Sequence, residues 1–334
     1  MQRIKSNSDI ILIIILGIIL RFKDLSKFDL WYDEAYTGLL MRLKPAEFYS
    51  MLAKDSHPPL FSLITKAWTF IFGVNDFTLR FLPFVFGVAT IYVVYRVALT
   101  LANEGLRSDD RSLLFSRSTA QACLSSQKGV KSSASENKET AAISAFLAAI
   151  NPFLIDYSIE ARSYSFYGLV TALTFLALLK RKTSLFALGI VVMTFTHYIS
   201  FTFIATFLIL YLFMNFKKIK KDLSVMIPLF IFLVLQVFFL LHKDTEFLNI
   251  YWVRSSNFLN IFRSMISYFI GIKSKLAGAD ELVDINFIFN QMVWGSILVF
   301  AFLLGTLYLV LKKGAHLKNL ITVLLPVILP QIIL

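Results

Sequence analysis

The chain has 334 residues, of which 57% are apolar and 16% are charged, and its formal net charge is +12. Soluble domains are about 45–50% apolar with about 25% charged residues, so this composition excludes a soluble enzyme, a disordered protein and a coiled coil. Long apolar runs recur along the chain, and a helix satisfies its own backbone groups inside lipid. The sequence therefore predicts an all-α, multi-pass integral membrane protein. The single cysteine, Cys123, excludes a disulfide framework and a Cys-based metal site.

The first predicted span comprises residues 10–20, directly after the basic residues Arg3 and Lys5. A cleavable signal peptide would have a similar length, but residues 20–23 offer no small-residue cleavage site, which favours an uncleaved helix. Further ranges with the apolar character of spans are 81–102, 141–155, 164–179, 223–241, 285–311 and 319–334.

The apolar range 184–216 is too long for one crossing of a hydrocarbon core about 30 Å thick. We therefore predict two short spans that turn near His197 and Tyr198, which brings the total to about nine transmembrane helices. Two other apolar ranges, 58–73 and 258–272, carry polar residues along one stripe. They are predicted to be amphipathic helices at the membrane interface.

Lysine and arginine clusters indicate the orientation of these helices. Placing the clusters and the N-terminus in the cytoplasm satisfies the positive-inside rule. The excess positive charge then lies on the cytoplasmic side and attracts anionic lipid, so it is not a nucleic-acid footprint. In this topology residues 21–80 form a large extracytoplasmic loop. Residues 104–140 are polar and rich in serine, and we predict a disordered cytoplasmic loop.

The predicted catalytic domain comprises residues 1–334 as one unit. The sequence stops inside an apolar run, so we expect a C-terminally truncated fragment of a longer protein.

Two adjacent carboxylates, Asp33 and Glu34, follow the first predicted span directly after Trp31 and Tyr32. One interpretation is structural: Asp33 would cap a helix over residues 35–43, and Glu34 would lie in its first turn. The other interpretation is chemical, because a carboxylate at the membrane surface can accept a proton from a bound substrate. The two residues alone leave both interpretations open.

Other polar residues occur at the same predicted outer level. His57 follows Asp55 and precedes two prolines, and such a pair is more often a surface hydrogen bond than a metal or phosphate contact. Glu160 and Arg162 lie in a short link between two predicted spans, where charges are costly unless the link faces water or a polar cavity; a salt-bridged turn is the alternative. His197 is the weakest signal, since a capped or interfacial histidine would fit equally well.

Carboxylates and cations that meet at the outer mouth of a helix bundle suit transfer from a lipid-linked, phosphate-activated substrate. A carboxylate can take the acceptor proton, while guanidinium and ammonium groups stabilise the departing phosphate. A transporter would more often place its charges inside the spans, and the predicted helix interiors are nearly free of charge.

Three blocks of the sequence resemble a known family. They read LWYDEAYTGLL, DSHPPLFSLITKAWTFIFGVNDFTLRFLPFVFG and INPFLIDYSIEARSYSFYGL. In this order they are similar to the bacterial and archaeal branch of the GT-C glycosyltransferases. That branch is related to dolichyl-phosphate-mannose–protein mannosyltransferases and to the lipid A aminoarabinose transferase. The resemblance covers residues 10–179, and family members are usually longer and lack the insertion at 104–140.

The resemblance implies a membrane transferase with an extracytoplasmic active site. It would move a sugar from a polyprenyl-phosphate donor to a lipid, glycan or protein acceptor, with inversion at the sugar. Asp33 matches the family's acidic residue and is the expected general base, and Glu34 completes the catalytic pair. The expected contacts of the donor and its phosphate are His57, Lys66, Glu160, Arg162 and His197.

No nucleotide cofactor is expected, since the sequence contains no phosphate-cradling glycine loop. A divalent metal at Asp33 and Glu34 is an alternative, because some relatives use one, but we expect a metal-free site. The expected partners are the donor, the acceptor and membrane lipid. The rival hypotheses are a lipid-linked sugar flippase or transporter without chemistry, and a catalytically inactive scaffold.

Overall fold

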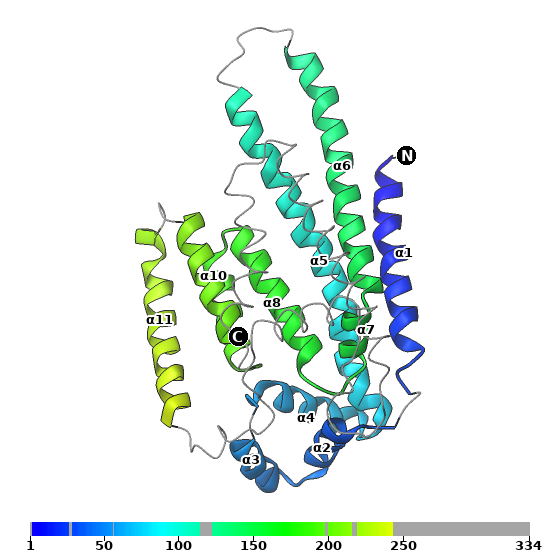
Figure 1. Cartoon of the computed structure of the whole chain (residues 1–334), viewed down its shortest axis with the longest axis vertical. Helices are drawn as coiled ribbons and strands as arrows, with labels where there is room; N and C mark the ends of the chain where they lie inside the picture. The colour runs from blue at the N-terminus through cyan, green and yellow to red at the C-terminus, as the bar shows by residue number, and fades with distance from the viewer. Residues whose placement is uncertain are drawn as a thin grey trace, which may run out of the picture. The chain divides into compact units, whose positions relative to one another are not determined.

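The computed structural model describes residues 2–26, 29–55, 57–113, 122–197, 200–215 and 219–242. These residues form helices and no strands (Figure 1), which confirms the all-α prediction for the described part of the chain. The helices are α1 (Gln2–Phe22), α2 (Tyr32–Arg42), α3 (Pro45–Lys54), α4 (Leu60–Phe72), α5 (Asp76–Leu113), α6 (Ala122–Ile150), α7 (Pro152–Ser158), α8 (Tyr164–Leu179), α9 (Thr183–Thr194), α10 (Ser200–Asn215) and α11 (Ile219–His242). The chain divides into two compact units, and the packing described below lies within the first, Met1–Ile150 with Leu154–Val234.

Within the described residues, one helix is long and apolar enough to cross a membrane, Asp76–Asn103 in α5. A second crossing would result if the pair Glu136–Ile150 and Pro152–Ser158, which meet at 59°, formed one broken span. The nine spans that the sequence predicts are therefore unsupported.

The difference arises because several predicted spans form short or broken helices. The apolar ranges 164–179 and 184–216 give α8, α9 and α10, which have 16, 12 and 16 residues, whereas a crossing needs about 20. The predicted span at 141–155 is interrupted, since α6 ends at Ile150. The predicted spans at 285–311 and 319–334 and the interfacial helix at 258–272 lie outside the described residues.

The polar segment 104–140 also differs from its prediction as a disordered loop. Helix α5 continues to Leu113, and α6 begins at Ala122. The polar turns at the end of α5 and at the start of α6 each extend an apolar helix. Adding turns to an existing helix avoids the costly nucleation step. At the level where the two helices become apolar, Asn137 Nδ2 donates to Asn103 Oδ1 at 3.0 Å. The residues between the helices, 114–121, lie outside the described residues.

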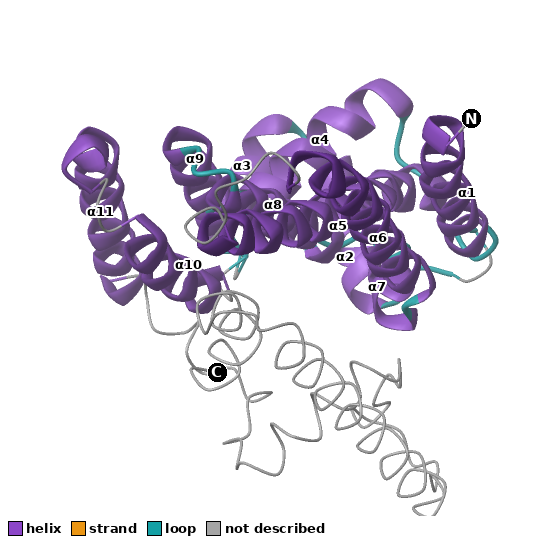
Figure 2. Ribbon diagram, turned by 90° about the horizontal axis from the view of Figure 1, so that it is seen from above, coloured by secondary structure: helices purple, strands orange, loops and turns teal. Residues whose placement is uncertain are grey.

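Small residues on α6 allow it to pack closely against α1 and α5. Ala141, Ala145 and Ala149 recur every four residues on one helical face and are fully buried. They pack with Ile10 of α1 and with Ile91 of α5, in one core cluster. Figure 2 views these helices nearly end-on, with α1, α5 and α6 gathered together. This core holds α1 beside the helix that is long enough to span a membrane.

The short helices α2, α3 and α4 lie at the end of α5 where that helix begins (Figure 1). Pro45 favours the start of α3, because its fixed φ suits the first helical turn. Gly73, with φ of 79°, ends α4 in a conformation that disfavours other residues. Asn75 and Thr78 then cap α5 reciprocally: each backbone N–H donates to the other's side chain, at 3.1 and 2.9 Å. These local signals set the helix ends, and Leu40 of α2 and Phe48 of α3 pack in one cluster with Leu79 of α5.

Arg21 supports the break between α6 and α7. Pro152 lacks an N–H group, so the Ala148 carbonyl loses its usual helical donor. The Arg21 guanidinium is fully buried and donates to the Ala148 and Ala149 carbonyls at 3.2 and 2.8 Å. It also donates to Ser158 Oγ at 3.1 Å. Arg21 therefore fixes the end of α7, directly before the loop that carries Arg162.

Candidate functional site

A small pocket lies where α2 and α4 meet the loop that precedes α8. Its volume is ≈ 20 Å³, which is room for about one water molecule. The lining residues are Tyr36, Thr37, Leu40, Asp55, His57, Pro58, Phe61, Ser62, Arg162 and Ser163. The pocket therefore combines an apolar wall with a carboxylate, an imidazole and a guanidinium.

Arg162 links the polar groups of this site. Its Nη2 lies 3.6 Å from Asp33 Oδ2 and 3.2 Å from His57 Nε2. Its side chain also hydrogen-bonds the Tyr164 hydroxyl. The guanidinium is only 14% exposed, whereas the Asp33 carboxylate is 34% exposed. The structure thus brings together the predicted base and two predicted phosphate contacts, at the edge of a pocket that solvent reaches.

Asp55 orients His57 toward Arg162. The His57 backbone N–H donates to Asp55 Oδ1 at 2.9 Å, and His57 Nδ1 lies 3.3 Å from the same oxygen. A tautomer with its proton on Nδ1 donates to Asp55 and leaves Nε2 to accept from Arg162. Burial alone would raise the pKa of Asp55, but the hydrogen bonds from His57 and the charge of Arg162 lower it below its ordinary value.

Tyr36 completes this polar group from α2. Its hydroxyl hydrogen-bonds Asp55, and burial together with this carboxylate raises the pKa of Tyr36 above its ordinary value. Near neutral pH the tyrosine is therefore protonated and donates to the ionised Asp55.

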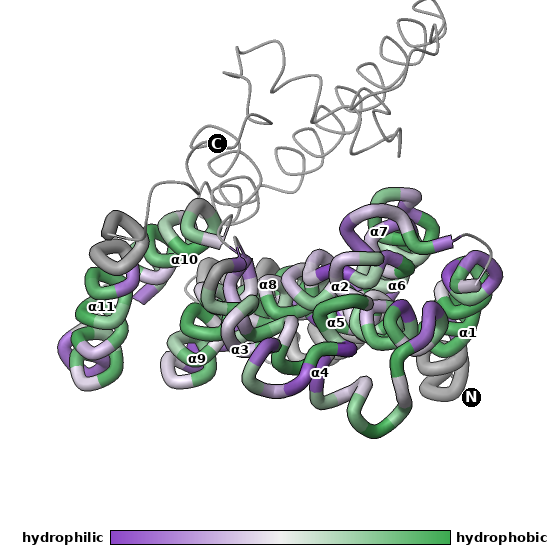
Figure 3. The backbone as a smooth tube through the Cα atoms, turned by 90° about the horizontal axis from the view of Figure 1, so that it is seen from below, coloured by the Kyte–Doolittle hydropathy of each residue, from purple (hydrophilic) through white to green (hydrophobic). Residues whose placement is uncertain are grey.

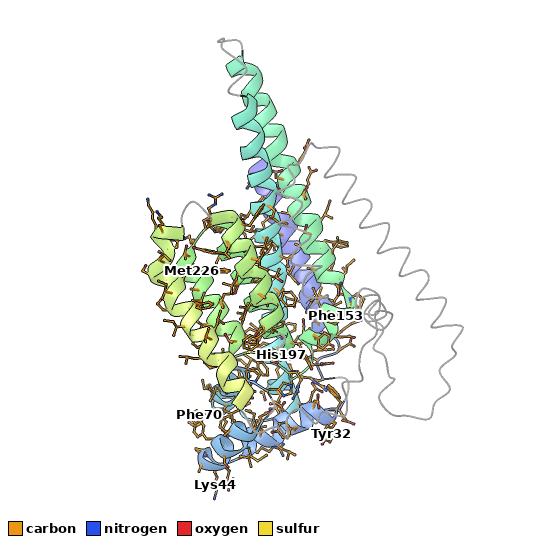
Figure 4. All side chains as sticks on the ribbon, turned by 60° about the vertical axis from the view of Figure 1, so that its left-hand side comes forward. Tyr32, Lys44, Phe70, Phe153, His197 and Met226 are labelled. Atoms are coloured by element: carbon orange, nitrogen blue, oxygen red, sulfur yellow. The ribbon has the colours of Figure 1, made fainter. Side chains whose placement is uncertain are left out.

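His197, which Figure 4 labels, lies in the turn between α9 and α10 and contacts the site. Its ring centroid lies 5.9 Å from that of His57 and 5.8 Å from that of Tyr164. Burial, with the charges of His57 and Arg162, lowers the pKa of His197 to about 4. The imidazole is therefore neutral near pH 7. The turn is tied to α4 by a hydrogen bond of 3.1 Å from the Leu60 N–H to the Phe195 carbonyl.

Glu34, predicted to complete the catalytic pair, lies in a buried ion pair and not at the pocket. Its carboxylate is 1% exposed and forms an ion pair of 2.6 Å with Arg80. One oxygen accepts from Arg80 Nε and the Ala161 N–H at 2.9 and 2.8 Å. The other accepts from Arg80 Nη2 and, at 3.3 Å, from the Trp31 N–H. With both oxygens engaged inside the protein, Glu34 is a brace between α2, α5 and the Arg162 loop.

The helix cap predicted at Asp33 is also wrong in its position. Helix α2 begins at Tyr32, with Trp31 as the N-cap residue. Asp33 therefore lies within the first turn, and the reciprocal contact to the N-cap backbone comes from Glu34. Asp33 is therefore not the N-cap residue, and its carboxylate is available to Arg162.

Lys66, a predicted phosphate contact, is directed to the end of α2 and not to the pocket. Its ammonium donates to the Met41 and Leu43 carbonyls at 2.6 and 2.8 Å, and it lies 5.1 Å from the Phe48 ring centroid. Carbonyls at a helix C-terminus are natural acceptors for such a cation. Lys66 therefore fixes α4 to α2.

Glu160 is buried beside the loop that carries Arg162, with 6% of its surface exposed. Its carbonyl accepts the Arg162 N–H at 2.7 Å, and its charge acts on Arg80 and Tyr164. Glu160 thus shapes the loop and its electrostatics.

Arg80 and Arg21 are important contacts that the sequence prediction missed. The sequence places both only at the two ends of the predicted extracytoplasmic loop 21–80. A charge at the edge of an apolar helix is a recognised signal of function, and it could have marked both arginines. Nothing in the sequence identifies their partners, which lie 46 and 137 residues away.

Within the described residues, no three His, Cys, Asp or Glu side chains are placed to hold a metal ion. No protein-family model, curated protein or solved structure matches the chain.

Proposed function

We propose that the protein is a membrane glycosyltransferase that uses a polyprenyl-phosphate sugar. The observation that carries this proposal is the contact of Arg162 with both Asp33 and His57 beside the pocket. A carboxylate next to a guanidinium provides a proton acceptor and a phosphate-binding group at one place. The three sequence blocks that resemble GT-C glycosyltransferases contribute these residues.

In the proposed reaction, an acceptor hydroxyl attacks the anomeric carbon of the donor sugar. The bond between that carbon and the phosphate oxygen breaks, and its electron pair leaves with polyprenyl phosphate. Asp33 takes the hydroxyl proton, and Arg162 binds the phosphate oxygens as their charge increases. Attack opposite the phosphate inverts the anomeric configuration.

The remaining residues position these two groups. His57, held by Asp55, limits where the Arg162 guanidinium can lie, and neutral His197 adds no competing charge. Glu34 is bonded to the Ala161 N–H and is adjacent in sequence to Asp33. The buried Glu34 carboxylate therefore holds Ala161, the residue before Arg162, close to the part of α2 that carries Asp33. The pocket has room for a phosphate oxygen or a water, so the sugar would bind at its mouth.

Exposed apolar side chains support a membrane location, and the distribution of basic residues in the sequence favours an extracytoplasmic site. Large exposed side chains occur on several helices, and Figure 3 shows the apolar turns of α5, α8 and α10 in green. Examples are Leu12 of α1, 64% exposed, and Leu188 of α9, 58% exposed. Such surfaces suit lipid rather than water.

The role of Arg162 can be tested with purified protein in nanodiscs and a panel of radiolabelled polyprenyl-phosphate sugars. Arg162→Ala should reduce transfer by roughly 10- to 100-fold, the loss expected when a hydrogen bond to a charged group is removed. Arg162→Lys keeps the charge without the planar fork, so it should retain part of the activity.

Arg96→Ala is the matched control, because the side-chain contacts described for Arg96 are with Tyr92 alone: the hydroxyl at 2.9 Å and the ring centroid at 5.8 Å. It should transfer sugar like the unchanged protein. Equal transfer by Arg162→Ala and the unchanged protein would contradict the proposed phosphate contact. Movement of a labelled lipid across the bilayer with no glycosidic product would favour the flippase instead.

A further inference from the structure

Helix α4 is amphipathic, but its polar side faces the protein. Thr65 and Thr69 are 1% and 4% exposed, and each hydroxyl bonds to a carbonyl of its own helix. The ammonium of Lys66 is also directed inward, to the end of α2. The opposite side of α4 carries Phe70 and Ile71, which are 90% and 71% exposed.

The outer face of α4, defined here as Leu63, Ala67, Phe70 and Ile71, is exposed at helical spacing and has no charge. A helix on a water-facing surface has the reverse arrangement, with polar residues outside and apolar residues against the core. Helix α4 has its polar residues inside and its apolar residues outside. This arrangement is expected when the surroundings of the helix are less polar than the protein interior beneath it.

An aromatic cluster connects α4 to the start of α5. Trp68 packs on Phe72 and Phe81 with centroid distances of 4.1 and 6.0 Å, and its Nε1–H donates to the Thr78 carbonyl at 2.9 Å. Phe77 continues the cluster, 5.3 Å from Phe81 and 6.4 Å from Phe22 of α1. Aromatic side chains of this kind concentrate at membrane–water interfaces.

The distribution of exposed apolar residues favours lipid over a protein partner. A single partner protein would cover one patch, whereas these residues lie on helices throughout the first unit. Besides the outer face of α4, they include Ile11 and Ile19 of α1, Val85 of α5, Leu185 of α9, and Leu212 and Phe213 of α10.

We propose that the outer face of α4 lies against lipid in the membrane interface and contacts acyl chains. With 13 residues, α4 is about 20 Å long, too short to cross a core of about 30 Å. Its other side supplies Phe61 and Ser62 to the pocket, so one helix would separate the pocket from lipid. This inference depends on the membrane insertion proposed above, and its test separates the two.

Site-directed fluorescence quenching in nanodiscs tests the inference. The native thiol is removed by Cys123→Ser, and a single fluorophore is attached after Ala67→Cys or Ile71→Cys. Val85→Cys on α5 provides the reference for insertion of the span, and Glu136→Cys, on an exposed polar part of α6, provides the water-facing reference. Each labelled protein is titrated with phosphatidylcholine carrying an acyl-chain spin label and, separately, with iodide.

We expect the spin-labelled lipid to quench the probes at 67 and 71 as strongly as the probe at 85, with little quenching by iodide. The probe at 136 should give the opposite pattern. If the probe at 85 is quenched by lipid while those at 67 and 71 respond to iodide, or to neither quencher, α4 faces water or protein and the inference is wrong. If the lipid quenches none of the three, membrane insertion itself fails, and the proposed function fails with it.

Discussion

Two adjacent carboxylates have different surroundings in this protein. Successive helical residues point about 100° apart, so Asp33 faces Arg162 with 34% of its side chain exposed, while Glu34 is 1% exposed against Arg80. The first can exchange a proton with a bound molecule. The second is surrounded by hydrogen-bond donors and supports its neighbours.

Glu34→Gln should destabilise the protein, because it leaves the buried Arg80 guanidinium without its counter-ion. Breaking a buried ion pair from one side typically costs about 3–5 kcal/mol. The measurement is the free energy of unfolding in mixed micelles, with Asp33→Asn as the matched control on a more exposed carboxylate. The control should change stability little. Equal stabilities of Glu34→Gln and the unchanged protein would show that the brace is not important for folding.

At the scale of elements, close contacts between α5 and the end of α7 determine where the Arg162 loop starts. Gly87 of α5 faces Ser158, whose hydroxyl bonds both Arg21 Nε and the Leu154 carbonyl. A side chain at position 87 would separate these elements. The loop that carries Ala161 and Arg162 begins directly after this contact.

Gly87→Ala should therefore destabilise the protein, since the added Cβ would lie 2.5 Å from Ser158 Cβ, well inside a normal contact. The expected cost is about 1–3 kcal/mol, as for other overpacked cores. Gly168→Ala on α8 is the control, because nothing lies within 4 Å of its added Cβ. It should stabilise the helix by up to about 1 kcal/mol. Thermal unfolding of both variants checks the prediction, and a Gly87→Ala protein as stable as Gly168→Ala would contradict it.

Helix formation could be predicted from the apolar ranges, whereas helix breaks and partners could not. Hydropathy marks residues 164–179 as helical, and the structure has α8 at those residues. It does not reveal that Pro152 ends α6 within a predicted span, since Pro83 lies inside α5 without ending it. The sequence also does not indicate whether the polar stripe of α4 faces the protein or its surroundings. Amphipathicity identifies the polar residues of a helix but not what they contact.

Part of the candidate site could likewise be predicted from the sequence. Asp33, His57, Arg162 and His197 were singled out by residue type and by position near predicted span ends, and the structure brings these four together. Lys66 was singled out in the same way, yet its ammonium bonds α2 carbonyls. The difference depends on tertiary packing, which local sequence does not encode.

At the scale of the whole molecule, the site combines segments that are far apart in the chain. Asp33 and Arg162 are 129 positions apart in the sequence, yet their side chains lie 3.6 Å from each other. Helices α1, α5 and α6, which pack on one another, support the two segments that carry them. The Arg80–Glu34 ion pair and the Arg21 contacts keep this assembly in register. The proposed function therefore requires the first unit as a whole. Within that unit, the proposed proton acceptor is Asp33.

The most direct test of that assignment is sugar transfer by Asp33→Asn in nanodiscs, with a radiolabelled polyprenyl-phosphate sugar on which the unchanged protein is active. Asparagine keeps the size and polarity of the side chain but cannot accept the proton. Losing a general base typically reduces a rate by about 10²–10⁴-fold. We predict normal membrane insertion and unfolding, with transfer reduced at least about a hundredfold. Near-normal transfer by a correctly folded Asp33→Asn protein would contradict the account.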